Sequence, residues 1–555
     1  MASSGLQVVC VCEHVVFGLA CFHLLRVYRR GGGGGLAGEL LRWIRALPGV
    51  DIALAAILTS EAKGAVRLLT KASNNDHDGS TNEAEKRRRR RVCMDDEPVE
   101  AAEILRQLSD LRGGSEQHIT DGTVFAFVYT PNEDSHAQLM HSAFNALTDP
   151  TGLGQRHDNL LQDVYALFAH GNALNPTAFP SLLRLENEVV AMTAAMLNGD
   201  EQVAGTLTSG GTESILMAMK THRDRARALS PHIKHPEVVA PISVHPAFEK
   251  AAHYFDLTVV HIPLGADLKP DLTKYRQAIT SNTILLVASA PQYCHGVVDP
   301  IEEIGQMALD HGLPFHVDAC FGGFMLPWVE QLGFPVPVFD FRVPGVTSMS
   351  ADLHKYGYVN KGASVVLYRD ASIRKYQFFA YSAWPGGLFG SPSMAGTRPG
   401  GNIAMAWSGL KVLGKKGFLK MARELMDLTE KLKAGICAIP GLEIMGQPQM
   451  TCFAFRSTDP SLEILAVADV MEEKGWKIER QQEPACLHCT ILPHHLRSGD
   501  KYLPDLAASV AHVRANSQLA RKGTAAMYGQ MAMIPDKAII DDFVVNFFSE
   551  IYTPR

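Results

Sequence analysis

Three groups of residues have types and spacings that could do chemistry. The first is Leu207 to Ser214 (LTSGGTES), which precedes a segment of apolar residues at helical spacing. The pattern predicts a helix that begins at Gly210, Gly211 and Thr212. Unpaired backbone N–H groups and the helix dipole bind phosphate at such a position, and glycine lets the anion approach closely. A turn that only caps the helix would have the same sequence.

The second group surrounds Asp318. The segment Phe315 to Gly323 (FHVDACFGG) predicts a buried strand that ends at this aspartate. Ligands of open α/β sheets bind at the carboxyl ends of strands. A buried carboxylate there is costly unless it meets a cation. The alternative is an aspartate that caps the following turn.

The third group is Ser350 to Gly357 (SADLHKYG), which places Lys355 in the loop after strand-like residues 346–349. A desolvated lysine forms an imine with an aldehyde, whereas an isolated lysine is more often a surface residue. The three groups follow one another in the order of a pyridoxal phosphate (PLP) site. Its protonated ring nitrogen is the cation that Asp318 would meet. We therefore predict a PLP site with Lys355 as the Schiff-base lysine.

The elements that must position these groups alternate between strand-like and helical from about residue 101 onwards. This alternation predicts a mainly parallel sheet covered by helices. A long helix predicted over residues 403–434 leads into a smaller α/β region. The predicted strands include residues 237–244, 257–262, 283–289, 313–318, 363–368 and 485–492.

The N-terminal part is of a different character. Leu6 to Leu25 is mainly apolar and is followed, but not preceded, by arginines, which predicts one transmembrane helix with the N-terminus lumenal and the catalytic domain cytosolic. The basic run Lys86 to Arg91 predicts a solvated, disordered linker, either as a plain spacer or as a segment that is attracted to anionic lipid headgroups. The predicted regions are a membrane anchor (1–30), a flexible basic linker (31–100), an N-terminal helical segment (101–200), a large PLP-binding domain (201–408) and a small α/β domain (409–555).

Net charge and cysteine spacing give no indication of nucleic-acid binding, disulfide bonds or a zinc site. A formal net charge of -6 on 555 residues gives no electrostatic reason to expect nucleic-acid binding. Ten cysteines without the spacing of a disulfide scaffold predict free thiols. Cys486 and Cys489 with His494 and His495 have the types of half a zinc site, but the alternation around them favours a buried strand. We therefore predict no metal site.

These motifs, together with Ser391 to Gly401 (SPSMAGTRPGG), carry a family resemblance. The sequence resembles the group II decarboxylase-like branch of PLP enzymes and, within it, the sphingosine 1-phosphate lyases, from about residue 101 to the C-terminus. The resemblance implies the fold of PLP-dependent transferases of type I (aspartate-aminotransferase-like). In that fold a mainly parallel seven-stranded sheet is joined to a smaller C-terminal α/β domain. It also implies a homodimer and a location in the endoplasmic reticulum membrane.

Individual roles also follow from this resemblance. It implies that Lys355 holds PLP covalently, that Asp318 faces the ring nitrogen, and that His245 stacks on one ring face while Cys320 lies near the other. A helix cap is the alternative role for His245. Contacts to the cofactor phosphate are expected from Gly210, Gly211, Thr212, His354 and Ser350, and contacts to the substrate head group from Tyr129, Asn172, Lys361 and Arg398.

The implied reaction is a retro-aldol cleavage of a phosphorylated sphingoid base into a fatty aldehyde and phosphoethanolamine. The base could be Lys355, His354 or a phosphate oxygen of the substrate. An amino-acid decarboxylase would share Lys355, Asp318 and His245, and a catalytically silent membrane scaffold is the other alternative. Asn175 and Phe389 stand where the family pattern has histidine and tyrosine.

Overall fold

The protein is described here by a computed structural model that covers residues 122–125, 157–516, 518–519 and 537–553. Residues 108–523 form one compact unit, and residues 1–107 with 524–555 form a second. The described part of the second unit contains helix α20 (Ala538–Ile551). The predicted anchor, the basic linker and Tyr129 lie outside the described residues. Among the residues that are described, no helix is both long and apolar enough to cross a membrane.

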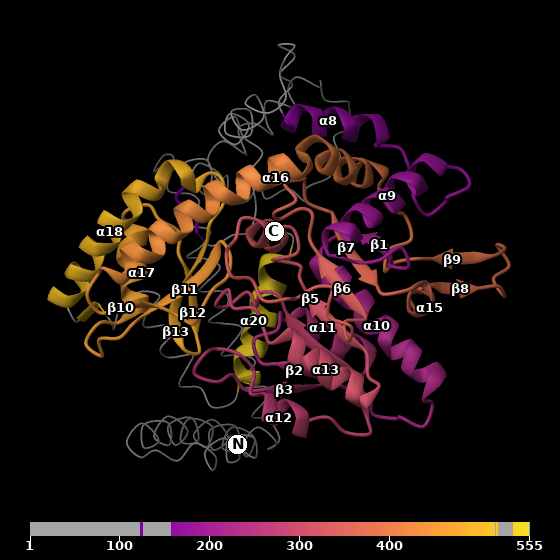
Figure 1. The fold of residues 1–555 in the computed structure, drawn as a ribbon, viewed down its shortest axis with the longest axis horizontal. Helices are drawn as coiled ribbons and strands as arrows, with labels where there is room; N and C mark the ends of the chain where they lie inside the picture. Colours follow the sequence, from indigo (N-terminus) through magenta and orange to yellow (C-terminus); the bar gives the residue numbers. More distant parts are fainter. Residues whose placement is uncertain (1–121, 126–156, 517, 520–536, 554–555) are drawn as a thin grey trace, which may run out of the picture. The chain divides into compact units, whose positions relative to one another are not determined.

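A seven-stranded sheet forms the centre of the larger unit, with the strand order β1-β7-β6-β5-β4-β2-β3 (Figure 1). Five neighbouring strands, from β6 to β3, run parallel. All seven residues of β4 are buried, as expected for a strand that is covered on both faces. The prediction of a mainly parallel sheet is confirmed. The strands are β1 (Ala204–Thr208), β2 (Glu237–Pro241), β3 (Thr258–Ile262), β4 (Thr283–Ser289), β5 (Phe315–Asp318), β6 (Ser348–Ala351) and β7 (Ser364–Tyr368).

Strand β7 runs antiparallel to both of its neighbours, β6 and β1. A parallel return needs a crossover, usually a helix, whereas residues 352–363 contain only turns and lead directly back. Because β7 is antiparallel to each of them, β1 and β6 point the same way. The carboxyl ends of β1, β5 and β6 therefore meet at one edge of the sheet. Ser350, predicted in the loop after a strand, lies within β6.

Helices cover both the sheet and its edges. Helix α10 packs against β6, β7 and α11. Helix α16 connects the large sheet to the C-terminal part (Figure 1) and is kinked at Gly414, whose φ of 54° is readily adopted by glycine. The predicted boundary between residues 408 and 409 falls inside α16. The helices are α8 (His157–Phe168), α9 (Pro180–Met196), α10 (Gly211–Leu229), α11 (Ala247–Phe255), α12 (Leu272–Gln277), α13 (Ile301–His311), α14 (Leu326–Gln331), α15 (Ala371–Arg374) and α16 (Gly400–Cys437).

The C-terminal part of the larger unit is a four-stranded antiparallel sheet with the order β10-β11-β13-β12. Cys486 and Cys489 lie buried in β13, the strand that alternation predicted over 485–492. Helix α17 packs on β13, and α18 packs on α16 and α17. The elements are β10 (Leu442–Ile444), β11 (Cys452–Ser457), α17 (Ile464–Glu473), β12 (Glu479–Gln482), β13 (Ala485–Thr490) and α18 (His495–Ala515).

Candidate active site

The predicted phosphate turn joins β1 to α10. Gly210 is the N-cap, and Ser214 is the first residue whose N–H bonds back into the turn, to Gly210 O at 3.0 Å. The three N–H groups before it therefore face out of the helix end, where the positive end of the helix dipole lies. A Cβ on Gly211 would lie 2.6 Å from Asp352 Oδ2 and 3.0 Å from Cys320 Sγ. Only glycine fits there, and this turn is able to hold a phosphate.

Asp318 ends β5 at the same edge of the sheet. Its side chain is nearly buried, and Oδ1 accepts hydrogen bonds from Cys320 N at 3.0 Å and from Ser350 Oγ at 3.1 Å. Within the described part of the chain, no residue bonds to Oδ2. One oxygen of this carboxylate is thus held in place while the other remains available to a cationic N–H donor.

Lys355 lies in the turn after β6 and forms an ion pair with Asp352, with 2.9 Å between Nζ and Oδ2. Asp352 is 2% exposed, and no residue in the described part of the chain hydrogen-bonds to its buried Oδ1. Burial is the largest single influence and lowers the pKa of Lys355, but the charge of Asp352, the hydrogen bond to it and weaker effects of neighbouring groups together raise the pKa. Asp352 is a residue of the site to which sequence reasoning gave no role. Its position three residues before the lysine was the available signal.

His354 lies between this pair and the phosphate turn. Its Nδ1 accepts from Ala363 N at 3.3 Å, and its Nε2 is 3.6 Å from Asp352 Oδ2. Burial lowers its pKa to about 4, so the ring is neutral at pH 7 and carries its proton on Nε2. A Cβ on Gly210 would lie 3.3 Å from the ring. His354 is therefore placed beside the phosphate turn as a donor.

His245 and Cys320 approach the site from two other elements. His245 follows β2, and its Nδ1 accepts from Ala247 N at 3.1 Å at the start of α11, so it also acts as a helix cap. Desolvation lowers the pKa of His245, and the nearby carboxylate of Asp318 opposes that effect. Cys320 is buried next to Asp318, and burial raises the pKa of its thiol. Stacking of His245 on a ring stays a prediction.

Lys361 is a second cation of the site. Its Nζ donates to His354 O at 3.3 Å. Burial, and then repulsion by Lys355, lowers its pKa to about 8. The site therefore contains one lysine held as an ammonium ion by a carboxylate and a second lysine that loses its charge more easily.

Arg398 is bound within the protein by a buried carboxylate. Its guanidinium donates to both oxygens of Glu186, at 2.6 and 2.9 Å, and to Ala173 O at 3.1 Å. Glu186 also accepts from Leu207 N at 2.9 Å, just before the phosphate turn. The Arg398 and Glu186 side chains are 11% and 8% exposed. This geometry gives Arg398 a structural role, and its predicted contact with the substrate phosphate remains a prediction.

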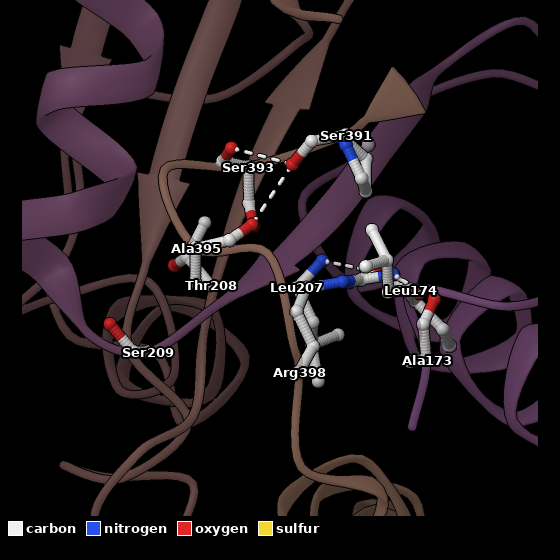
Figure 2. Close-up of polar contacts among 12 residues, drawn as sticks. Ala173, Leu174, Leu207, Thr208, Ser209, Ser391, Ser393, Ala395 and Arg398 are labelled. Atoms are coloured by element: carbon white, nitrogen blue, oxygen red, sulfur yellow. Dashed lines mark hydrogen bonds and ion pairs between the residues drawn. The ribbon is translucent and has the colours of Figure 1, made fainter. Parts of the chain in front are cut away.

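Asn172 belongs to the same structural cluster. Its Oδ1 accepts from Leu174 N at 3.0 Å and from Arg398 N at 3.2 Å. The loop before Arg398 is closed by Ser391, whose Oγ donates to Ala395 O at 2.9 Å (Figure 2). Asn172 therefore fixes the end of this loop through its side-chain oxygen. Its predicted contact with a substrate remains a prediction.

Comparisons with known proteins agree with this geometry. Residues 133–458 match the family model described as the pyridoxal-dependent decarboxylase conserved domain. The chain is 43% identical to sphingosine-1-phosphate lyase of Arabidopsis thaliana, over 71% of this chain and 73% of that protein, and 42% identical to sphingosine-1-phosphate lyase 1 of Rattus norvegicus, over 71% and 69%. The chain belongs to the sphingosine-1-phosphate lyase family.

Solved structures place the family in its wider fold. The sphingosine-1-phosphate lyase of Burkholderia pseudomallei superposes with a TM-score of 0.70 at 36% identity, covering 79% of this chain and 95% of that one. The glutamate decarboxylase of Lactobacillus brevis superposes with a TM-score of 0.63 at 18% identity, covering 78% and 97%. At that identity the second likeness shows the fold alone.

The residues fit the PLP cofactor of this family. The outward N–H groups of α10 suit its phosphate, the available Oδ2 of Asp318 suits a protonated ring nitrogen, and Lys355 offers an amine to its aldehyde. The prediction of PLP as cofactor is confirmed by family membership. The hydroxyl of Ser350 bonds to Asp318, and its predicted contact with the cofactor phosphate remains a prediction.

Replacing Lys355 with alanine should abolish covalent attachment of PLP completely, because it removes the amine that the turn after β6 offers to the aldehyde. The measurement is borohydride reduction followed by mass spectrometry of the peptide that contains residue 355, together with the visible absorbance of the purified protein. Lys361→Ala is the matched control, since it removes the neighbouring amine and should leave the covalent link intact. Covalent cofactor on Lys355→Ala protein would show that the assignment is wrong.

Proposed function

We propose that this chain cleaves the C2–C3 bond of phosphorylated sphingoid bases, releasing a fatty aldehyde and phosphoethanolamine. The observation that carries the proposal is the joint presence of Lys355, Asp352 and Asp318 in one buried site of a chain 43% identical to a protein named sphingosine-1-phosphate lyase. In this reaction the C3 hydroxyl loses a proton, its oxygen becomes the aldehyde carbonyl, and C2 gains a proton. No other reactant is needed.

The protein's own groups divide this task. PLP, when bound, supplies the electron sink that makes cleavage at C2 possible. Asp318, fixed by Cys320 N and Ser350 Oγ, would supply the negative charge that pairs with the ring nitrogen. The proton carrier that the geometry favours is Lys355, because Asp352 lies 2.9 Å from Nζ and stabilises the ammonium form. His354 is the weaker base, since burial lowers its pKa to about 4 and its Nδ1 already accepts a hydrogen bond.

Lys361 is the cation that the described residues offer to the substrate phosphate. Its ammonium group lies close to Lys355 and Asp352, which act on its charge. With a pKa of about 8, it is mainly protonated at pH 7 and can pair with a phosphate. A phosphate would in turn favour the ammonium form, because opposite charges in a partly buried site strengthen each other. Tyr129 remains a second candidate from sequence.

The substrate class is tested by product analysis. Detergent-solubilised protein with PLP should convert dihydrosphingosine phosphate to the long-chain aldehyde and phosphoethanolamine, both detected by mass spectrometry. Lys355→Ala protein should form neither product. Glutamate and aromatic amino acids should give no CO₂ above the level of that variant. Release of CO₂ without aldehyde would make the chain an amino-acid decarboxylase, and no turnover of any substrate would favour the silent scaffold.

We further propose that residues 1–30 anchor the protein in the endoplasmic reticulum membrane, with the catalytic part in the cytosol. The apolar run Leu6 to Leu25, followed by arginines, supports this location. A membrane location also suits a substrate with one long hydrocarbon chain. All of the motifs lie in the compact unit of residues 108–523, which does not include the anchor.

Deleting residues 1–30 should therefore release the protein from membranes while it keeps its activity on a detergent-dispersed substrate within about twofold, since an independent unit keeps its own core. Fractionation of cells by centrifugation, followed by activity measurement of the supernatant, checks both parts. Full-length protein should sediment with membranes. A truncated protein that still sediments in a folded form would contradict the anchor.

We also propose that the chain works as a homodimer. The hairpin of β8 (Phe379–Tyr381) and β9 (Phe389–Ser391) extends away from the sheet (Figure 1). It carries exposed apolar side chains, with Tyr381 50%, Trp384 52% and Leu388 89% exposed. Such a group of exposed side chains is typical of a protein interface. The loop between Ser391 and Gly400 begins where this hairpin ends. A partner bound to the hairpin would therefore lie close to that loop.

Changing Trp384 and Leu388 together to glutamate should weaken the dimer, because two charges would be buried in the interface. Sedimentation velocity at micromolar concentration should show a mass near one chain for this variant and near two chains for the unaltered protein. Leu309→Glu, at a position on α13 about as exposed as Trp384, is the control and should remain dimeric. A double variant that remains dimeric would exclude the hairpin from the interface.

A further inference from the structure

A chain of buried polar side chains lies behind Asp318 in the sheet. The parallel pairing of β5 with β6 sets His316 beside Ser348 and Asp318 beside Ser350. Residues two apart in a strand point to the same face, so these four side chains share one face. Helix α10 packs against β6 and brings His222 to this group. None of the five residues is more than 7% exposed.

Hydrogen bonds connect the five residues without a break. Ser350 Oγ lies 3.1 Å from Asp318 Oδ1 and 3.3 Å from His316 Nε2. On the other side of that imidazole, Nδ1 lies 2.9 Å from Ser348 Oγ, which in turn lies 3.0 Å from His222 Nε2. A change in the hydrogen bonding of His222 or Ser348 can therefore affect the carboxylate of Asp318 at the other end of these hydrogen bonds.

The direction of these hydrogen bonds follows from counting protons. Burial lowers the pKa of His316 to about 4 and that of His222 to about 3, so both rings are neutral at pH 7 and each has one N–H. An ionised Asp318 only accepts, so the single hydrogen of Ser350 goes to it. Ser350 must then accept from His316 Nε2–H, His316 Nδ1 must accept from Ser348, and Ser348 from His222 Nε2–H.

The His222 end of this hydrogen-bond chain favours the same direction. None of the described residues hydrogen-bonds to His222 Nδ1, which is buried. In the direction just described it is an unprotonated acceptor. If the hydrogen bonds ran the other way, Ser350 would donate to His316, and His222 Nδ1 would become a buried N–H donor with no acceptor among the described residues. Unpaired buried N–H groups are rarer than unsatisfied acceptors, so this end favours the direction in which Ser350 donates to Asp318.

We infer that Ser348 and His316 are positioning residues that keep the hydroxyl hydrogen of Ser350 directed at Asp318, and thereby favour a protonated ring nitrogen when PLP is bound, through a one-way chain of hydrogen bonds from His222. The inference rests on the proposed PLP chemistry but not on the identity of the substrate. Ser348 is the decisive link because its hydrogen fixes the tautomer of His316. Without it, Nδ1 can carry the proton, Nε2 becomes an acceptor, and the Ser350 hydrogen is drawn away from Asp318.

The test compares Ser348→Ala with Thr221→Val. Each removes one buried hydroxyl, but that of Thr221 bonds to Met217 O at 2.6 Å and Tyr368 Oη at 2.9 Å, outside the chain that leads to Asp318. Each protein is reconstituted with PLP that carries ¹⁵N in the ring. The ring signal should be that of a protonated nitrogen in the unaltered protein and in Thr221→Val, and should move toward the unprotonated position in Ser348→Ala. The dissociation constant of PLP should rise about tenfold in Ser348→Ala alone, the size expected for one lost hydrogen bond that acts on a charge.

An unchanged ring signal and affinity in folded Ser348→Ala protein would overturn the inference. If that variant does not fold, His316→Gln and His316→Leu decide, because glutamine keeps one donor and one acceptor and leucine keeps neither. Glutamine should then retain the protonated signal that leucine loses, and equal signals from the two would also overturn it. Failure of the proposed function would look different, as a protonated ring nitrogen in unaltered protein that releases no aldehyde.

Discussion

The parallel register between β5 and β6 is the constraint on which the rest of the site depends. It sets Asp318 beside Ser350, and the chain then leaves β6 through the turn that carries Asp352 and Lys355. A shift of one residue in this register would send Asp318 to the opposite face of the sheet. The antiparallel return of β7 matters for the same reason, because it makes β1 parallel to β6 and brings the phosphate turn to the same edge.

Electrostatic compensation explains why so many charged groups can share this small volume. Two of the buried carboxylates are neutralised by a basic side chain: Asp352 by Lys355, and Glu186 by Arg398. Burying either charge alone would be strongly unfavourable, whereas burying the pair with hydrogen bonds is tolerated. The Glu186 pair also fixes the strand before the phosphate turn. It therefore contributes to the site without having to contact a ligand.

Residue type and spacing predicted the parts of this structure that depend on local pattern. The apolar runs predicted the bounds of β3, β4 and β5 to within a few residues. The three motifs lie together as expected, because the ends of neighbouring strands must meet. Partners distant in sequence could not be predicted. Glu186 and Arg398 are 212 residues apart, and nothing in either segment indicates the other. Asp352 had a signal in its spacing to Lys355, but a carboxylate at that distance in a turn also suits a cap.

The two aspartates of the site are stabilised in different ways, and the difference follows from what each must face. Asp352 neutralises a lysine of its own chain, so a direct ion pair suits it. A cation beside Asp318 would compete with the ring nitrogen for the same charge and lower its proton affinity. Neutral donors, Cys320 N and Ser350 Oγ, avoid that competition because they hold the carboxylate without cancelling its charge. The buried histidines behind Ser350 extend the same solution, since burial keeps both of them uncharged.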